Sequence, residues 1–384
     1  MKNLNVPNSG NVPKLRFPEF TEDWERVLLN YFLEENKERN KKNEFSKKDV
    51  LSVSGEFGIV NQIELLGRSF AGKSVLDYHI VRSGNIVYTK SPLKEYPYGI
   101  VKVNEGDDGI VSTLYAVYNV KKNANGKFVE YYFGLPNRTN KYFKPIVRIG
   151  AKHDMKIGNE EVLANYVVFP KISEQNRITD FISLLDQRIA TQNKIIEQLQ
   201  SLIKGIYDKV FEDISNYQKL SSVCTIQKGQ QVNGEELSEL GDYYVMNGGI
   251  EPSGYYDRYN TDANTISISE GGNSCGYVQY NNVSFWSGGH CYTLQNIKEG
   301  YHNLFLYHYL KAREKEIMAL RIGSGLPNIQ KKDLEKFIVP ILPLETQVGI
   351  VDGINKIETK LKQEKDMLLA YQKQKSYLLR NLFI

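Results

Sequence analysis

Residues 174–211 read EQNRITDFISLLDQRIATQNKIIEQLQSLIKGIYDKVF, and residues 346–383 read TQVGIVDGINKIETKLKQEKDMLLAYQKQKSYLLRNLF. The second stretch repeats the first at an offset of 172 residues. In both, apolar residues recur in alternating steps of four and three, the spacing that places them along one seam of a coiled-coil helix. The sequence therefore predicts two long helices in a chain built from two repeats.

Each predicted helix has a single apolar seam and needs a partner, which the other helix supplies. The polar residues Gln192 and Glu364 stand at seam positions in the middle of the two helices. The symmetry of the repeat predicts Gln192 near Leu368 and Ile196 near Glu364. The residues expected to form the helix–helix interface are Ile182, Leu185, Ile189, Ile196, Leu199, Ile203, Ile354, Ile357, Leu361, Leu368, Tyr371 and Leu378.

The connection between the helices indicates their relative direction. A segment of about 130 residues joins the end of the first helix to the start of the second, and a compact domain of that size is only about 35 Å across. In a parallel pair those two ends would lie a full helix length, about 55 Å, apart. We therefore expect the two helices to run antiparallel.

Shorter repeats surround the helices. The motif RIGA at 148–151 recurs as RIGS at 321–324, and runs such as NIVYTK (85–90) and TISIS (265–269) are typical of strands. These features predict an α+β fold with two similar domains separated by an antiparallel two-helix coiled coil, related by a pseudo-two-fold repeat. The expected division is a flexible segment at 1–19, domains at 20–172 and 213–343, and spacer helices at 173–212 and 344–384.

Composition narrows the class of protein without identifying it. The chain has 384 residues, 41% hydrophobic content and a formal net charge of +4, which fits a globular protein of two or three domains and is compatible with nucleic-acid binding. Its start lacks an apolar signal core, and no later run approaches the ~20 apolar residues that span a bilayer, so we expect a cytoplasmic protein without a membrane partner. The three cysteines lack C-x-x-C spacing and are expected to be buried thiols.

Residues 67–74, GRSFAGKS, match the G-x-x-x-x-G-K-S pattern of a phosphate-binding loop. Such a loop works between a strand and a helix whose N-terminus faces the phosphate. Only about nine residues separate Ser74 from the next Ser-Gly pair, and no apolar strand ending in a well-placed Asp follows to hold magnesium. We interpret the motif as a coincidence and Lys73 as a solvated lysine or a contact to a nucleic-acid phosphate.

Other catalytic signatures are missing from the sequence. The five histidines never take H-x-x-x-H or H-E-x-x-H spacing, so no metal site is expected. His290 and Cys291 are adjacent, but neighbours on a strand face opposite sides, which disfavours a catalytic pair. There is no G-x-S-x-G elbow and no Rossmann-type glycine fingerprint. We predict no catalytic residues.

Three polar stretches suit recognition of nucleic acid: YTKSPLKEYPYG (88–99), KYFKPIVRIGAKHDMK (141–156) and RIGSGLPNIQKKD (321–333). Cations follow phosphates, Asn and Gln can read adenine edges, and Arg can read guanine. Ordinary surface loops would have a similar composition. The candidate DNA-binding residues are Lys73, Lys90, Ser91, Lys94, Tyr96, Tyr98, Arg148, Lys152, Asn273, Arg321, Ser324, Asn328, Gln330, Lys331 and Lys332.

Five stretches, in order along nearly the whole chain, resemble the specificity subunits of type I restriction–modification enzymes. They are PKLRFPEFTEDW (13–24), SPLKEYPYGIVKV (91–103), PKISEQNRI (170–178), GSGLPNIQKKDLEKF (323–337) and LPLETQVGI (342–350). Asn85 and Thr346 depart from the residues usual in that family.

The resemblance implies two target-recognition domains, each reading half of a split double-stranded DNA sequence, with the paired helices as a ruler. It also implies a non-catalytic chain. Methylation would belong to partner modification (methyltransferase) subunits that bind S-adenosylmethionine, and ATP- and Mg-dependent translocation and cleavage to restriction subunits. The residues themselves leave two alternatives open, a P-loop NTPase and a coiled-coil scaffold that binds no DNA.

Overall fold

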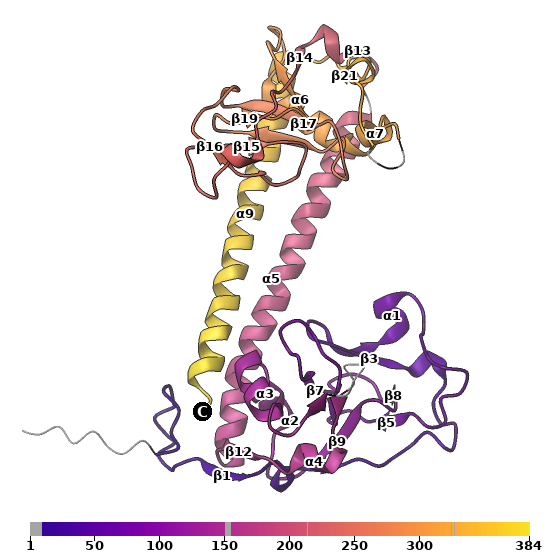
Figure 1. Cartoon of the computed structure of the whole chain (residues 1–384), viewed down its shortest axis with the longest axis vertical. Helices are drawn as coiled ribbons and strands as arrows, with labels where there is room; N and C mark the ends of the chain where they lie inside the picture. The colour runs from indigo at the N-terminus through magenta and orange to yellow at the C-terminus, as the bar shows by residue number, and fades with distance from the viewer. Residues whose placement is uncertain (1–9, 150–154, 213, 324, 326) are drawn as a thin grey trace, which may run out of the picture. The chain divides into compact units, whose positions relative to one another are not determined.

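The computed structural model describes residues 10–149, 155–212, 214–323, 325 and 327–384 (Figure 1). Contacts divide the chain into two compact units: unit 1 contains residues up to Thr191 together with Leu368–Ile384, and unit 2 contains Gln192–Met367. Both boundaries fall inside the long helices α5 (Ile172–Glu212) and α9 (Leu344–Asn381), so each unit holds part of both helices. Within the described part of the chain, we find no helix with the length and apolar character needed to cross a membrane.

Unit 1 is built around an antiparallel four-stranded sheet with the order β2-β9-β6-β7. Four antiparallel strand pairs, β1–β12, β3–β4, β5–β8 and β10–β11, surround it. The strands are β1 (Glu25–Leu28), β2 (Leu33–Glu35), β3 (Leu51–Ser54), β4 (Gly58–Asn61), β5 (His79–Val81), β6 (Ile86–Tyr88), β7 (Val101–Val103), β8 (Gly109–Val111), β9 (Ala116–Val120), β10 (Arg148–Ile149), β11 (Met155–Lys156) and β12 (Tyr166–Phe169). The shorter helices are α1 (Gln62–Leu66), α2 (Gly126–Tyr132), α3 (Pro136–Phe143) and α4 (Asn159–Leu163), with 3-10 turns at Leu29–Tyr31 and Lys47–Asp49.

Unit 2 has an antiparallel four-stranded sheet with the order β14-β20-β17-β18. A second sheet, β16-β15-β19, and the antiparallel pair β13–β21 complete its strands. The strands are β13 (Tyr217–Lys219), β14 (Thr225–Lys228), β15 (Tyr243–Met246), β16 (Tyr255–Tyr256), β17 (Thr265–Ser269), β18 (Val278–Asn281), β19 (Trp286–Ser287), β20 (Cys291–Gln295) and β21 (Ile338–Pro340). The shorter helices are α6 (Asn303–Ala312), α7 (Glu314–Ala319) and α8 (Lys331–Leu334), with 3-10 turns at Leu220–Ser222 and Gly234–Glu236.

The two four-stranded sheets share one connectivity. β6 lies between β9 and β7 in unit 1, and β17 lies between β20 and β18 in unit 2; all of these pairings are antiparallel. In each unit a two-stranded pair, β1–β12 or β13–β21, also joins the start of the domain to the strand that precedes a long helix. The predicted α+β fold with two similar domains is confirmed.

The long helices run antiparallel within each unit. In unit 1 the beginning of α5 packs against the end of α9, where Ile182 and Leu378 share one apolar cluster and Lys375 forms a 2.5 Å ion pair with Asp186. In unit 2 the end of α5 and the beginning of α9 share a cluster that includes Phe211 and Val351. These pairings place the start of one helix beside the end of the other, as the tethering argument predicts.

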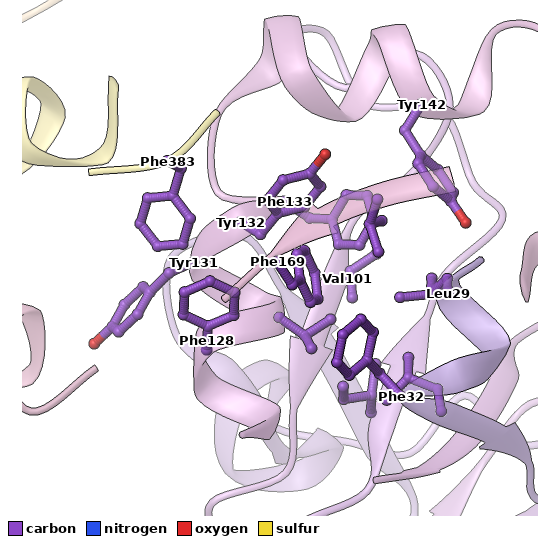
Figure 2. Close-up of a cluster of buried hydrophobic side chains, with 14 of the residues drawn as sticks. Leu29, Phe32, Val101, Phe128, Tyr131, Tyr132, Phe133, Tyr142, Phe169 and Phe383 are labelled. Carbon is purple, nitrogen blue, oxygen red and sulfur yellow. The ribbon is translucent and has the colours of Figure 1, made fainter. Parts of the chain in front are cut away.

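The core of unit 1 is aromatic where it receives the end of α9 (Figure 2). The ring of Phe128 in α2 lies 5.0 Å from that of Phe169 in β12 and 5.0 Å from that of Phe383. Trp24 contributes edge contacts to both Phe128 and Phe383. Burying each of these rings contributes roughly 2–3 kcal/mol, so residues from three distant parts of the sequence hold the chain end in place.

The GRSFAGKS segment does not form a phosphate-binding loop. Gly67 ends α1 in the left-handed conformation, with φ of 75°, and the segment then continues to β5. No helix begins within residues 67–78, all of which are described, so no helix N-terminus stands behind Ser74. The P-loop alternative is therefore not supported. The prediction of buried thiols is confirmed, because Cys224, Cys275 and Cys291 are free and buried.

A buried histidine makes unit 2 sensitive to acid. His308 of α6 is fully buried, with Nδ1 2.9 Å from the Tyr207 hydroxyl of α5 and 3.9 Å from a Glu358 carboxylate oxygen of α9. Burial lowers the pKa of His308 to about 4. Because the unfolded chain takes up a proton near pH 6.5 and the folded chain does not, this histidine's contribution to stability is complete above pH 6.5 and lost as pH falls towards 4.

We expect His308→Gln to flatten the fall in stability of unit 2 between pH 6.5 and 4. The full effect of a shift of this size is about 3 kcal/mol. Burial raises the pKa of Glu358, which acts in the opposite sense, so the difference between wild type and variant is the quantity to measure. Denaturant unfolding at several pH values tests this, with exposed His290→Gln as the control; equal slopes for wild type and His308→Gln would refute it.

Candidate nucleic-acid interface

Five loops of unit 2 meet beside the ends of the four-stranded sheet. They comprise the described residues of 228–231, 247–249, 270–274, 288–290 and 321–330, and are called here the loop face. Main-chain hydrogen bonds join neighbouring loops: Gly229 N to Cys291 O (2.8 Å), Gly288 N to Met246 O (2.8 Å), Glu270 N to His290 O (2.9 Å), Gly272 N to Pro327 O (3.0 Å) and Ile329 N to Glu270 O (2.8 Å). The loops therefore form one connected surface.

Glycine is required where these loops touch. A Cβ atom on Gly229 would lie 2.2 Å from the carbonyl oxygen of Gly288, and one on Gly288 would lie 2.5 Å from the Asn247 side chain. Such distances are shorter than any real Cβ contact, so backbones approach each other here in a way that only glycine permits. The recurring GG and SGG dipeptides and tripeptides of this half of the sequence reflect that packing.

Glu270 is the buried centre of the loop face. One carboxylate oxygen, Oε1, accepts from Lys228 Nζ (2.6 Å) and from the Tyr292 hydroxyl (3.0 Å). The other, Oε2, lies 3.6 Å from His290 Nδ1 and is buried without a hydrogen-bond partner among the described residues. The carboxylate of Glu270 thus contacts β14 and β20. Its main chain also bonds to His290 and Ile329, so Glu270 joins both strands to the 321–330 loop.

The candidate residues of unit 2 gather on or beside this face with exposed side chains. Asn273, Arg321, Asn328, Lys331 and Lys332 are exposed, and Gln330 donates to Asn328 Oδ1 at 3.1 Å. Ile322 and Asn328 exchange two main-chain hydrogen bonds, which hold these two residues side by side. Ser324 lies outside the described residues. The result is a surface rich in amides and cations, which are the groups that contact base edges and phosphates.

Sequence reasoning missed several residues of the loop face. Gln231 and His290 are exposed there, and Asn247 accepts a hydrogen bond from His290 N at 3.1 Å. Lys228 and the buried Glu270 were not among the candidates either. The signal that could have found them is the repeated pairing of glycine with a polar residue in MNGG, SEGGNS and SGGH.

The candidate residues of unit 1 fall into two groups. Lys90 is half-buried with φ of 47°, and its Nζ donates to Ile157 O at 3.0 Å and to Asn159 Oδ1. Burial lowers the pKa of Lys90. The Tyr96 hydroxyl donates to Gly134 O at 2.8 Å, and Tyr98 packs against the core. These side chains hold the loop in place.

The remaining candidates of unit 1 are less enclosed. Lys73 and Lys94 are exposed, while Ser91 is half-buried and donates to Thr89 O at 3.2 Å. The Arg148 side chain is 81% exposed and lies 3.7 Å from Glu161. Lys152 lies outside the described residues. Unit 1 thus presents cations from separate segments, which the described contacts do not join into one cluster.

A charged residue follows the central strand of the sheet in each unit. Lys90 stands two residues after the end of β6, and Glu270 directly follows β17. Lys90 Nζ bonds to the carbonyl of Ile157, and Glu270 O bonds to the amide of Ile329. Ile157 follows β11, which pairs with β10, and Ile329 follows Asn328, which pairs with Ile322, so each unit attaches a paired segment to the chain just after its central strand.

The twelve candidate seam residues are all buried or half-buried. Ile182, Leu185, Ile196, Ile354 and Leu378 are buried, and the others are half-buried. The polar seam residues pair with each other, because Gln192 Nε2 donates to the main-chain oxygen of Glu364 at 3.0 Å and to its carboxylate. The symmetry of the repeat did not predict this contact. Hydrogen bonds from Lys360 and Gln192 lower the pKa of Glu364.

Comparison with known proteins agrees with this architecture. Residues 214–369 match the family model described as the type I restriction modification DNA specificity domain. Over 173 residues, 44% of this chain and 46% of the relative, the chain is 31% identical to a protein named as a type I specificity subunit of Mycoplasma pneumoniae. Over 122 residues, 32% of each chain, it is 35% identical to one from Mycoplasma genitalium. The chain spans about half the length, or less, of these curated relatives.

Solved structures show the same fold. The crystal structure of a type I restriction–modification S subunit from M. genitalium matches with a TM-score of 0.66 at 17% identity, covering 97% of this chain and 99% of the other. A chain from a study of complex assembly and conformational transition in a type I system matches with a TM-score of 0.54 at 16% identity, over 94% and 97% of the two chains. The fold defines an α+β protein of two related domains with paired long helices. Residues 214–369 are similar to the DNA specificity domain of type I restriction–modification systems, and the chain as a whole shares the fold of the solved S subunit.

Proposed function

We propose that the chain is a DNA-binding specificity subunit that reads a target in two parts, one part by each unit. The observation that carries the proposal is the duplication itself: one sheet connectivity occurs twice, each time followed by a long helix. A duplicated recognition domain provides two reading surfaces in one chain. The description of the matched family model, a DNA specificity domain, supports DNA as the ligand.

The loop face of unit 2 has the chemistry that base reading requires. Asn and Gln can form two hydrogen bonds with adenine, and Arg can do so with guanine, whereas lysines contact phosphates at any sequence. Asn273, Asn328 and Gln330 supply the amides, and Arg321 and Lys331 the cations. The glycine-packed backbone beneath them keeps these groups in fixed positions. In unit 1 we assign the corresponding role to the loop that carries Lys94 and to Arg148.

We further propose that this chain has no catalytic activity and works with partner subunits. Methyl transfer would reside in modification subunits that bind S-adenosylmethionine, and ATP- and Mg-dependent steps in restriction subunits. Exposed apolar side chains on the long helices support protein partners: Phe181 and Leu184 are 38% and 60% exposed on α5, and Leu369 and Tyr377 are 50% and 60% exposed on α9. These side chains offer apolar surface on the helices for a partner subunit to cover.

The spacer role follows from the helix lengths. α5 has 41 residues and α9 has 38, so each would extend about 60 Å at ~1.5 Å per residue. We propose that this length sets the gap between the two half-sites.

Selection from random-sequence DNA tests the proposal. The chain is purified with and without modification subunits, and bound duplexes are sequenced and footprinted. We expect two short conserved blocks separated by a gap of constant length. A single conserved block would contradict reading by both units. No sequence preference, in a chain that still binds the modification subunits, would favour a scaffold that does not read DNA.

The exposed Lys73 provides a test against the NTPase reading. We expect no ATP turnover by the isolated chain. We expect Lys73→Ala either to leave DNA affinity unchanged or to lower it by a few-fold equally for all sequences, as the loss of a phosphate contact would. ATP hydrolysis that disappears in Lys73→Ala would contradict this account.

A further inference from the structure

A fully buried glutamine lies near the start of α5. Gln175 is 0% exposed, and its side-chain amide makes three hydrogen bonds to main-chain groups. Nε2 donates to Pro170 O (2.9 Å) and to Asn123 O (3.3 Å), and Oε1 accepts from Asn125 N (2.9 Å). Asn125 is the N-cap of α2, the helix that carries the aromatic core of unit 1. The glutamine therefore joins the long helix, the turn before it and the start of α2.

The same arrangement recurs in unit 2. Gln347 lies near the start of α9 and is also 0% exposed. Its Nε2 donates to Leu342 O (2.8 Å) and Gly300 O (2.8 Å), and its Oε1 accepts from His302 N (2.8 Å). His302 is the N-cap of α6, the helix that packs on the sheet of unit 2. Donor for donor and acceptor for acceptor, this is the contact set of Gln175.

The amide of a glutamine side chain satisfies this contact set completely. It offers two N–H donors to the two carbonyls and one oxygen to the amide. Glutamate would keep the acceptor but place negative charge against two carbonyl oxygens, and methionine would leave all three main-chain groups buried without partners. Each glutamine is thus a polar bracket between a domain helix and the beginning of a long helix.

We propose that Gln175 and Gln347 are positioning residues that set the angle of each domain on the long helix that follows it, and thereby the permitted gap between half-sites. This inference rests on the proposed function. The gap between half-sites depends on where each reading surface lies relative to its long helix. A glutamine that fixes the domain on that helix therefore controls the gap. Neither glutamine belongs to the candidate DNA-binding residues, so base preference within a half-site does not depend on them.

Each junction has a second contact, so we expect the domain to stay attached when the glutamine is lost. In unit 1 the Tyr131 hydroxyl of α2 donates to Asp186 Oδ2 of α5 at 2.7 Å. In unit 2 the equivalent partners, His308 and Glu358, lie 3.9 Å apart. The second contact is therefore weaker in unit 2. We expect Gln347 to contribute more to the orientation of its domain than Gln175 does.

The test uses the full chain assembled with modification subunits and a DNA library that contains both wild-type half-sites at every gap length. We expect Gln347→Met to relax spacing, so that the preference for the wild-type gap over gaps one base pair longer or shorter falls roughly tenfold, a change of about 1.4 kcal/mol in discrimination. Gln175→Met should act in the same direction with a smaller effect. The exposed Gln363→Met and Gln187→Met are matched controls.

The outcomes separate this inference from the function on which it rests. A thermal melt of each variant establishes that it is folded. If folded Gln347→Met binds more weakly at every gap but keeps the wild-type spacing preference, the glutamine is merely structural and the inference is wrong, while the proposed function stands. If the wild-type complex itself shows no paired half-sites, the proposed function fails. Relaxed spacing in Gln347→Met with unchanged half-site sequences supports the inference.

Discussion

Replacing Glu270 with alanine is expected to erase sequence selectivity in one half of the DNA target and leave the other half intact. Glu270 lies in the loop that presents Asn273, and its main-chain oxygen accepts from Ile329 in the loop that presents Arg321 and Asn328. Its carboxylate accepts from Lys228 of a third loop. Without the Glu270 carboxylate, Lys228 and His290 are no longer held near the same negative charge. The loops then do not hold the reading side chains at fixed positions. Each well-read base pair contributes about 1–3 kcal/mol of discrimination, so we expect a loss of roughly 100-fold at that half-site.

The fold should survive this change. The Tyr292 hydroxyl retains Ile329 O at 3.1 Å, and the Lys228 side chain, 52% exposed, can be solvated by water. The cost in stability is therefore about 1–2 kcal/mol, close to that of one or two hydrogen bonds. Selection of bound sequences measures the effect, with the exposed Glu251→Ala as a control. Equal loss of preference in both half-sites would show that Glu270 does not serve one reading surface.

Lengthening both long helices by one heptad is expected to change the gap between half-sites. Seven residues inserted after Gln192 in α5 and before Glu364 in α9 keep the seam continuous and keep Gln192 opposite Glu364, because the apolar residues repeat every seven positions. The insertion adds about 10.5 Å of helix, which corresponds to about three base pairs of DNA. We expect the preferred gap to lengthen by about that number and affinity for the original gap to fall by at least roughly 100-fold.

The sequences of the two half-sites should not change in this variant, because no residue of either domain is altered. Binding to a library of fixed half-sites with variable gaps measures the result. A heptad inserted into α5 alone is the matched control, since it disrupts the pairing of Gln192 with Glu364 and should lower stability instead of shifting the gap. An unchanged preferred gap in the double insertion would refute the spacer role of the helices.

Periodicity made the helices and the repeat predictable. Residues such as Ile182 and Leu378 recur at a spacing that few other structures produce, and the connection between the helices is too short for a parallel pair. The α+β character followed from short apolar runs between turn residues. The pairing of Gln192 with Glu364 was not predicted, because the symmetry argument placed each of them one helical turn away, Gln192 near Leu368 and Glu364 near Ile196.

The candidate site was less accessible to sequence reasoning. Lys90 and Tyr96 have the composition of binding residues, but whether a cation or a hydroxyl turns inward depends on acceptors such as Ile157 O and Gly134 O, which lie far away in the sequence. Glu270 contacts residues from loops that are far apart in the sequence. No local sequence pattern indicates that these loops come together around it. The brackets at Gln175 and Gln347 could have been found, because both stand at the same place in the repeated stretches.

Site-directed photocrosslinking tests most directly whether each unit reads its own half of the target. A photoreactive side chain replaces Asn273 in the loop face of unit 2, or Lys94 in unit 1, both of which are exposed. Each complex is irradiated on a duplex that carries the selected target, and the crosslinked bases are mapped. The account predicts crosslinks from position 273 in one half-site and from position 94 in the other. Crosslinks from both positions to the same half-site, or none from either while the duplex is bound, would contradict it.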